Sequence, residues 1–249
     1  MLHLLKRHPI PIRAHFDFVL ALTYAAPAAQ IRPLLPPGLT ADEWNGYGFL
    51  AAAFVQTRKL RPAGLPAFAG RSFFLAGYRV FARYTRRDGK RLRGLRILRS
   101  DADRRLMVAM GNLLTRYRYR LARVTLERGE GALALRVRTA DRLGDAELTA
   151  RLDGPPGWLP PGSPFADAKQ ARRFMGPMPF TFGYEPETHS IVRVEGVRRD
   201  WRPRTVPVDV RRLDALRHLA PGLEPVLASS FYLEAVDYRW RRGVREPLG

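Results

Sequence analysis

The hydrophobic residues of this chain gather in runs of strand length, and turn-forming residues separate the runs. Residues 16–24 (FDFVLALTY) and 46–60 (GYGFLAAAFVQTRKL) are rich in aromatic, branched and small apolar side chains, which is typical of buried strands. Residues 72–84 and 92–99 have the same character, and the turn sequence RDGK lies between them at 87–90. Asp-Gly between two such runs favours a tight hairpin. The first hundred residues therefore predict four strands, two of them joined as a hairpin.

The second half of the chain continues the strand pattern and adds short helices. Leu106, Met110, Leu113 and Leu114 recur at helical spacing and predict a helix over 105–115. Further strands are expected at 117–127, 132–139, 147–152, near 181, and at 191–198, 205–210 and 226–240, and further short helices at 28–35, 165–174 and 211–219. The pattern predicts an α+β fold made mainly of antiparallel β-strands. We expect a flexible N-terminal arm at 1–15 and a single domain at 16–249.

The composition supports a folded chain and excludes thiol chemistry. Hydrophobic residues make up 46% of the 249 positions and charged residues 27%, which is enough apolar material for a core and argues against disorder. The chain has no cysteine, so disulfides, thiolate metal sites and thiol nucleophiles are excluded. Only four lysines are present, at positions 6, 59, 90 and 169. A mechanism that uses a lysine amine therefore has few candidates.

The charge of the chain is strongly positive and has two interpretations. The 43 Lys and Arg residues against 23 Asp and Glu give a formal net charge of +20, which favours an anionic partner. The alternative is a compositional bias toward arginine. Residues 83–105 hold ten basic residues, and Tyr84, Tyr117 and Tyr119 lie close by as possible stacking groups. A basic module that binds nucleic acid, or another anionic polymer or surface, is therefore an alternative function, although no RRM, KH or helix-turn-helix signature is present.

Targeting, membrane and metal signals are weak. An apolar run at 16–29 follows the basic residues Lys6, Arg7 and Arg13, but Asp17 interrupts it, and no stretch reaches the ~20 apolar residues of a membrane-spanning helix. We therefore expect a cytoplasmic protein with no transmembrane segment. The five histidines lack the paired spacing of a metal site. We expect neither a metal nor a cofactor.

Two charged residues lie inside strand-like apolar sequence and are candidates for a binding site. Arg79 lies in the middle of the run at 72–84. Glu234 follows Tyr232 by two residues in the run at 226–240, so regular alternation places both on one face with Val236 and Tyr238. A charge in such a position either pairs with an opposite charge or lines a cavity.

Several segments together resemble a known family. Residues 25–40 (AAPAAQIRPLLPPGLT), the strand at 46–61 with the PAGLP that follows it at 62–66, and 100–106 (SDADRRL) are similar to the YqjF-like family of uncharacterised bacterial proteins. The likeness continues weakly to 201–203 (WRP). That family belongs to the acetoacetate-decarboxylase-like superfamily. The resemblance implies an antiparallel β-cone or barrel that encloses a cavity, with a few short helices.

The resemblance also points to particular site residues. The characterised enzymes of the superfamily use a lysine, in a Pro-Lys-Lys segment after the helix, that forms a Schiff base with a keto acid. Here residues 118–120 (Arg-Tyr-Arg) occupy that stretch, and the nearest lysine is Lys90. Tyr119 fits the YqjF-like branch, where tyrosine is common in this place. Of the Glu-x-Asn-x-Arg pattern of that branch, this chain keeps only Arg79.

These observations lead to one main functional expectation. We expect the cone to bind a small acidic or keto-type ligand, without a Schiff-base lysine and without lysine-dependent decarboxylation. Arg79 is the expected anion contact, because a guanidinium can hold a carboxylate with two hydrogen bonds. Tyr119 and Glu234 are the expected polar groups of the cavity wall.

Overall fold

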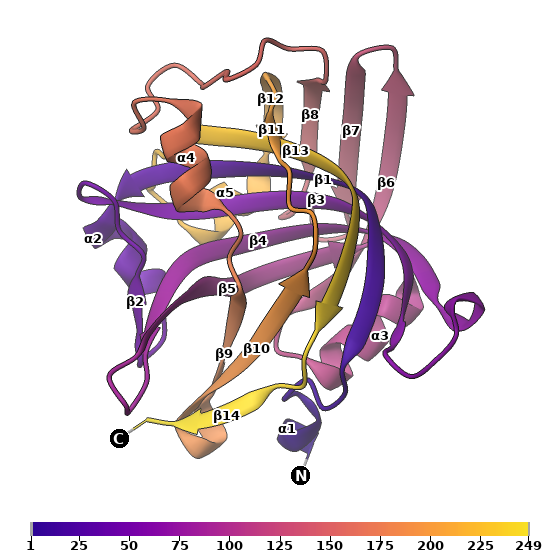
Figure 1. The fold of residues 1–249 in the computed structure, drawn as a ribbon, viewed down its shortest axis with the longest axis vertical. Helices are drawn as coiled ribbons and strands as arrows, with labels where there is room; N and C mark the ends of the chain where they lie inside the picture. The colour runs from indigo at the N-terminus through magenta and orange to yellow at the C-terminus, as the bar shows by residue number, and fades with distance from the viewer. Residues whose placement is uncertain (1, 249) are drawn as a thin grey trace.

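The fold is described by a computed structural model of residues 2–248, and it consists mainly of β-strands (Figure 1). The strands are β1 Ile12–Pro27, β2 Leu39–Ala41, β3 Tyr47–Pro62, β4 Arg71–Thr85, β5 Arg91–Ala102, β6 Tyr119–Gly129, β7 Ala132–Thr139, β8 Ala146–Arg151, β9 Phe180–Glu185, β10 Ser190–Arg198, β11 Arg204–Thr205, β12 Val208–Leu213, β13 Val226–Trp240 and β14 Val244–Pro247. The α-helices are α1 Leu2–Leu5, α2 Ala28–Ile31, α3 Arg105–Leu114, α4 Ala168–Met175 and α5 Asp214–Leu219, and the 3-10 turns are η1 Arg32–Leu34, η2 Ala67–Ala69 and η3 Pro186–Thr188. The expected fold class, α+β with mainly antiparallel strands and few short helices, is confirmed.

The strands around the centre of the molecule pair in a series that returns to its start. β13, β1, β3, β4 and β5 are antiparallel neighbours, and β5 pairs with β9 in parallel over residues 94–96. β9 pairs with β10, and Gly196 to Arg198 of β10 pair back with β13. Seven strands therefore surround a common interior. β6, β7, β8 and β12 extend the sheet beyond β5 and pack as a second layer.

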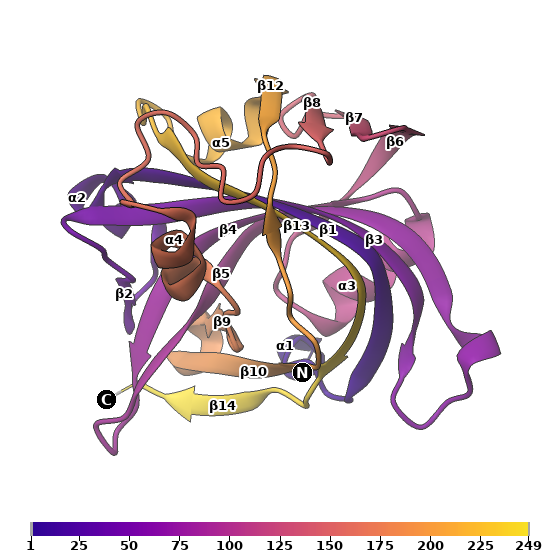
Figure 2. The ribbon, with the colours of Figure 1, turned by 45° about the horizontal axis from the view of Figure 1, so that its top comes forward.

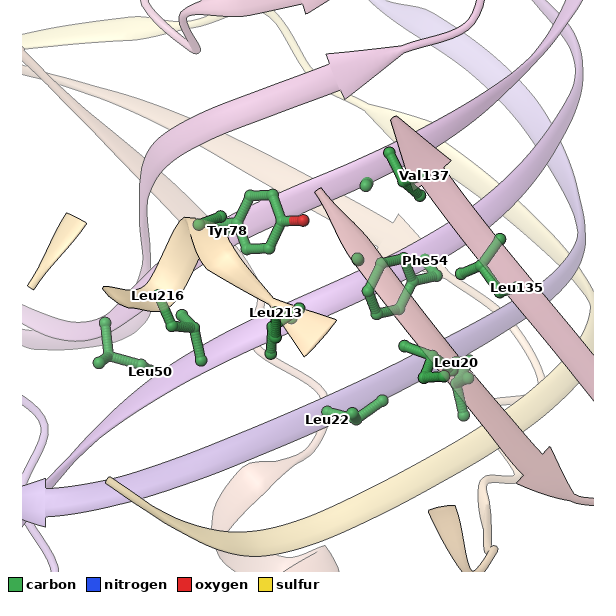
Figure 3. Packing of buried hydrophobic residues seen from close by; sticks show 14 of the residues in the cluster. Leu20, Leu22, Leu50, Phe54, Tyr78, Leu135, Val137, Leu213 and Leu216 are labelled. Atoms are coloured by element: carbon green, nitrogen blue, oxygen red, sulfur yellow. The ribbon is translucent and has the colours of Figure 1, made fainter. Parts of the chain in front are cut away.

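The two faces of the long strands have different surroundings, because successive side chains of a strand point to opposite faces. Leu20, Phe54 and Tyr78 belong to one face and pack against Leu135 and Val137 of β7 in the main core (Figure 3). These side chains are almost fully buried, and each contributes on the order of 2 kcal/mol through removal of apolar surface from water. The residues between them in sequence point into the interior of the ring.

The long neighbouring strands β1, β3 and β13 each contain an irregular position, and these positions lie near one another across the sheet. The pairing of β1 shifts between Phe16 and Phe18, and β3 and β13 contain Lys59 and Ala235 with φ of 52° and 53°. A positive φ in a non-glycine residue of a strand marks a bulge, which breaks the alternation and changes the face to which the following side chains point. Beyond these positions the strands curve around α3, as Figure 2 shows.

Several element boundaries differ from the sequence expectations, and three of the differences have a clear structural reason. β1 begins at Ile12, inside the segment expected as an arm, because residues 12–15 pair with both β3 and β13. The strand expected at 205–210 is two strands, since Pro207 interrupts it: β11 pairs with β13, and β12 pairs with β8. β12 also extends to Leu213, so α5 begins three residues later than predicted. Among residues 2–248, no helix is long and apolar enough to cross a bilayer.

Candidate functional site

The interior of the strand ring holds a cavity of about 750 Å³. Its walls come from β1, β3, β4, β5 and β13, and α3 lies on the concave side of these strands (Figure 2). The apolar lining includes Phe16, Val19, Ala53, Val55, Leu75, Phe81, Ile97, Met107 and Leu233. A volume in this range, with mostly apolar walls and a few polar groups, is typical of small-molecule sites.

The helix α3 contributes to this cavity in a way that the sequence did not indicate. Its apolar side was expected to face a core, yet Leu106, Met110 and Leu113 are 56%, 41% and 41% exposed. Leu106 and Met110 line the cavity, as does Leu114. The helix therefore covers the ring with an apolar face that remains partly open to solvent.

The charged groups that line the cavity are all of one sign. Arginines at positions 61, 71, 79, 104, 172 and 198 line it, and within residues 2–248 no aspartate, glutamate or lysine does. Arg71, Arg104 and Arg172 are exposed, whereas Arg61, Arg79 and Arg198 are half-buried. Burial lowers the pKa of Arg79 and of Arg198. The interior of the cavity is therefore suited to an anion.

Arg79 lies in the interior portion of β4, where it pairs with Ala51 of β3 and Ile97 of β5. Its side chain runs over Gly77, where a Cβ atom would lie 2.7 Å from Nη2. Its Nε is buried without a hydrogen-bond partner, and no carboxylate of the described chain forms an ion pair with it. Burial lowers the pKa of Arg79, and the ionisable groups that oppose this shift are tyrosine hydroxyls rather than acids. Arg79 is thus a half-buried cation that has no counter-ion among the described residues.

Tyr117 and Tyr119 line the cavity beside Arg79, as expected for Tyr119. Asn112 of α3 fixes this segment: its Nδ2 donates to the Tyr119 carbonyl at 2.9 Å, and its Oδ1 accepts from the Tyr119 amide at 2.8 Å. The Tyr119 ring packs on Gly111, where a Cβ would lie 2.3 Å from the ring. Burial raises the pKa of Tyr117 to about 12 and also raises the pKa of Tyr119. Both hydroxyls therefore stay protonated and can donate hydrogen bonds.

A second polar cluster lines the cavity, and the sequence reasoning missed it. Nη1 of Arg198 donates to the Tyr238 hydroxyl at 3.0 Å, and the guanidinium lies 4.9 Å from the centre of the Trp201 ring. Burial lowers the pKa of Arg198. Nε1 of Trp201 is buried without a partner. These residues come from two segments, the end of β10 with the loop that follows it and β13, so sequence spacing gave no signal that they meet. Trp201 lies in the WRP segment that carried part of the family resemblance.

His8 also lines the cavity, from the segment that the sequence marked as an arm. It is 5% exposed, its Nδ1 has no hydrogen-bond partner, and its amide donates to the Leu114 carbonyl at 2.9 Å. Burial lowers the pKa of His8 to about 4, so the ring is neutral at neutral pH. The residues just before β1 therefore form part of the cavity wall.

Glu234 does not lie with the other two expected site residues. Its side chain is 43% exposed, pairs with Arg128 of β6 and accepts a hydrogen bond from the Tyr232 hydroxyl at 2.7 Å. It is not among the residues that line the cavity. The reason is the positive φ at Ala235, which turns Val236 and Tyr238 toward the cavity side while Tyr232 and Glu234 point away from it. Of the two readings that the sequence left open for Glu234, the structure shows ion pairing.

The other chemistry considered from the sequence lies outside the cavity. None of the four lysines is among the residues that line it. In the part of the chain that the structure describes, no group of three or more His, Asp or Glu side chains is arranged to hold a metal. In the basic segment at 83–105, Arg83 and Arg93 both bind the buried Asp42, and Arg86 pairs with Glu246. Part of this positive charge is therefore neutralised within the fold.

The fold is similar to solved structures of acetoacetate-decarboxylase-like proteins. An acetoacetate decarboxylase from Legionella pneumophila matches with a TM-score of 0.65 and 15% identity over 95% of this chain and 87% of that one. The enduracididine biosynthesis enzyme MppR, complexed with the condensation product of pyruvate and imidazole 4-carboxaldehyde, matches with a TM-score of 0.65 and 14% identity over 95% of this chain and 89% of that one. An acetoacetate decarboxylase-like enzyme from Sphingomonas wittichii RW1 matches with a TM-score of 0.62 and 15% identity over 98% and 96% of the two chains. At these identities the likeness shows the fold.

The sequence comparisons then assign the family. No curated protein matches the chain. The family model DUF2071, described as "Uncharacterized conserved protein (COG2071)", matches residues 13–229. The YqjF-like resemblance is therefore confirmed: the chain belongs to the DUF2071 family and has the acetoacetate-decarboxylase-like fold.

Proposed function

We propose that this protein binds a small acidic or keto-type organic ligand in the cavity, with the anionic group of the ligand on Arg79. One observation carries the proposal: the half-buried guanidinium of Arg79, whose Nε is buried without a partner, lines a cavity in whose described walls there is no carboxylate. Burial of an unpaired cation is costly, and fixed structural arginines are normally paired. A ligand carboxylate would supply the missing partner with two charge-assisted hydrogen bonds.

The neighbouring tyrosine hydroxyls also favour a ligand that carries hydrogen-bond acceptors. Tyr117 and Tyr119 stay protonated, so they can donate to ligand oxygens that Arg79 does not reach. The Tyr117 hydroxyl also shares a hydrogen bond of 2.9 Å with Thr181, which holds its ring in place. A keto oxygen or the second oxygen of a carboxylate suits these donors.

We further propose that binding is non-covalent and that lysine-dependent decarboxylation does not occur. A Schiff base needs an amine at the bound carbonyl, and within residues 2–248 no lysine side chain lines the cavity. The likeness to acetoacetate decarboxylase at 15% identity supports a shared scaffold. We place this function in the cytoplasm on the sequence grounds given above.

Binding is tested by calorimetric titration with hexanoate, phenylpyruvate and levulinate as probes. We expect one or more of these to bind the wild type, and Arg79→Met to weaken binding by about 10- to 100-fold, because a hydrogen bond to a charged group contributes about 1.5–3 kcal/mol. Arg123→Met is the matched control, since Arg123 is exposed on β6 and its substitution removes the same charge. Equal affinity of Arg79→Met and wild type would refute the assignment of Arg79.

The absence of Schiff-base chemistry has its own measurement. Protein incubated with levulinate and sodium cyanoborohydride should show no stable mass increase on a lysine, because the reagent traps only an imine. A lysine adduct whose formation competes with hexanoate would contradict the proposal.

The alternative function, a basic module for nucleic acid or another anionic polymer, makes a different prediction. Retention on nucleic acid that falls steeply with added salt would support it, because phosphate contacts release counter-ions. Absence of retention even at low salt would exclude it. The pairing of Arg83 and Arg93 with Asp42 favours the small-molecule proposal.

A further inference from the structure

The cavity contains a second cluster of hydrogen-bond donors, which is separate from the proposed ligand contact at Arg79. Arg198 of β10 lies between two rings, 4.9 Å from the centre of Trp201 and 5.4 Å from that of Tyr238. Its side-chain partner is the neutral Tyr238 hydroxyl, and no described carboxylate pairs with it. Like Arg79, Arg198 is half-buried, its pKa is lowered by burial, and it has no counter-ion among the described residues.

Trp201 adds an unsatisfied donor to this cluster. Its indole Nε1 is buried without a hydrogen-bond partner, although an indole N–H is donor-only and is normally satisfied when it is buried. The ring lies close to Gly176, where a Cβ would come within 3.1 Å of Nε1. Because Gly176 has no side chain, the edge of the Trp201 indole can lie against it in the cavity wall.

Tyr238 connects the two cationic groups. Both Arg198 and Arg79 lower the pKa of its hydroxyl, against the larger effect of burial, which raises that pKa. The hydroxyl packs on Gly196, where a Cβ would lie within van der Waals overlap of it. Tyr238 therefore lies within electrostatic reach of both guanidiniums, and the two clusters belong to one cavity rather than to separate pockets.

The wall beside these clusters is apolar and the volume is large. The Phe16 ring lies 5.2 Å from that of Tyr238 and 5.8 Å from that of Trp240, and Val19 and Leu233 continue this surface. About 750 Å³ is in the range that holds drug-sized ligands, and it exceeds what a short keto acid fills.

We infer that the ligand is an elongated organic acid with two acceptor ends: a carboxylate at Arg79 and a second oxygen acceptor at Arg198 and Trp201, joined by an apolar chain that lies on Phe16 and Leu233. This inference rests on the proposed function, because it takes Arg79 as the first contact. It adds the substrate class, namely a two-ended acid in place of a short keto acid.

The experiment compares unbranched α,ω-dicarboxylates of four to twelve carbons with monocarboxylates of the same lengths by calorimetric titration. We expect one intermediate length at which the diacid binds about tenfold or more tighter than the matched monoacid, because the second carboxylate gains charge-assisted hydrogen bonds. We expect Trp201→Phe, which keeps the ring and removes the N–H, and Arg198→Met to move this ratio of affinities toward one. Arg123→Met is the control and should keep the wild-type ratio.

The outcomes separate this inference from the proposed function. If monoacids bind through Arg79 but no diacid in the series binds more tightly than its monoacid, the second site is refuted and the first stands. A preference for diacids that survives in both Trp201→Phe and Arg198→Met also refutes the second site. If neither series binds, the proposed function itself fails. Melting temperatures of all variants show whether a loss comes from unfolding, and Trp201→Phe keeps the test decisive if Arg198→Met does not fold.

Discussion

Arg79 and Arg99 lie on neighbouring strands of the same sheet, Arg79 half-buried and Arg99 almost fully buried, and their surroundings are opposite. Arg99, on the face toward β7 and β8, is 3% exposed and binds Asp101 and Asp141 with hydrogen bonds of 2.9–3.0 Å. Burial alone would lower the pKa of Arg99, but the hydrogen bonds to Asp141 and Asp101 raise it. On the cavity face, Arg79 has no carboxylate and its pKa is lowered. The fold thus neutralises an arginine in the packed core and leaves one without an acidic partner, among the described residues, where it lines the cavity.

A substitution beside Arg99 tests this comparison with the largest expected change in the free energy of unfolding. We expect Asp101→Ala to lower the free energy of unfolding by about 3 kcal/mol, because it removes one partner of a buried charge while Asp141 remains. Urea unfolding measures the change. Asp209→Asn is the control, since the carboxylate of Asp209 is exposed beside Arg211. A loss for Asp101→Ala no larger than that of the control would show that Arg99 does not need its pair.

His8 sharpens the comparison, because it is a buried nitrogen base that avoids an unpaired charge by remaining neutral. Burial lowers the pKa of His8 to about 4, against about 6.5 in an unfolded chain. As the pH falls from 6.5 to 4, the unfolded chain takes up a proton that the folded chain does not, so folding stability decreases. The expected loss attributable to His8 is on the order of 2–3 kcal/mol.

The measurement is the free energy of unfolding as a function of pH in wild type and His8→Gln. The variant should lose less stability than the wild type over this window, whereas His218→Gln, an exposed control, should follow the wild type. Parallel curves for His8→Gln and wild type would contradict the burial argument.

Substitution of Arg79 should change stability least, and the direction of the change is what distinguishes Arg79 from Arg99. We expect Arg79→Met to raise the free energy of unfolding by up to about 1 kcal/mol, since it removes a partly desolvated cation that no described carboxylate pairs with. Chemical denaturation without ligand measures it. Destabilisation of Arg79→Met by as much as a core truncation would mean that Arg79 has a structural role and would remove the contrast with Arg99.

The sequence predicted most of the strand framework and pointed to two side chains, Arg79 and Tyr119, that line the cavity. Arg79 could be found because β4 keeps its alternation of side chains and a charge within an apolar run stands out. Tyr119 came from the family resemblance. Arg198 and Trp201 could not be found, because they meet Tyr238 only through the pairing of β10 with β13 and through the loop that follows β10. His8 was missed because its segment has little pattern of its own.

Glu234 illustrates the limit more sharply. Regular alternation places Tyr232, Glu234, Val236 and Tyr238 on one face, and this assumption fails at Ala235. Alanine carries no signal for a left-handed conformation, which neighbouring strands impose through the bend that they share. Long-range geometry, rather than local preference, therefore decided which of these side chains entered the cavity.

The same bend at Ala235 decides which of the following side chains of β13 face the cavity, and therefore which charges line it. In an unbroken strand Asp237 would point inward and Tyr238 outward, and a carboxylate would sit where the two arginines need an anion. Asp237 instead lies outside, 2.8 Å from His15. One residue inserted between Val236 and Asp237 would reverse this order without changing any other letter of the sequence. A gain or loss of a single residue in β13 would thus be enough for a relative with this fold to exchange a cavity lined by unpaired arginines for one whose charge is neutralised from within.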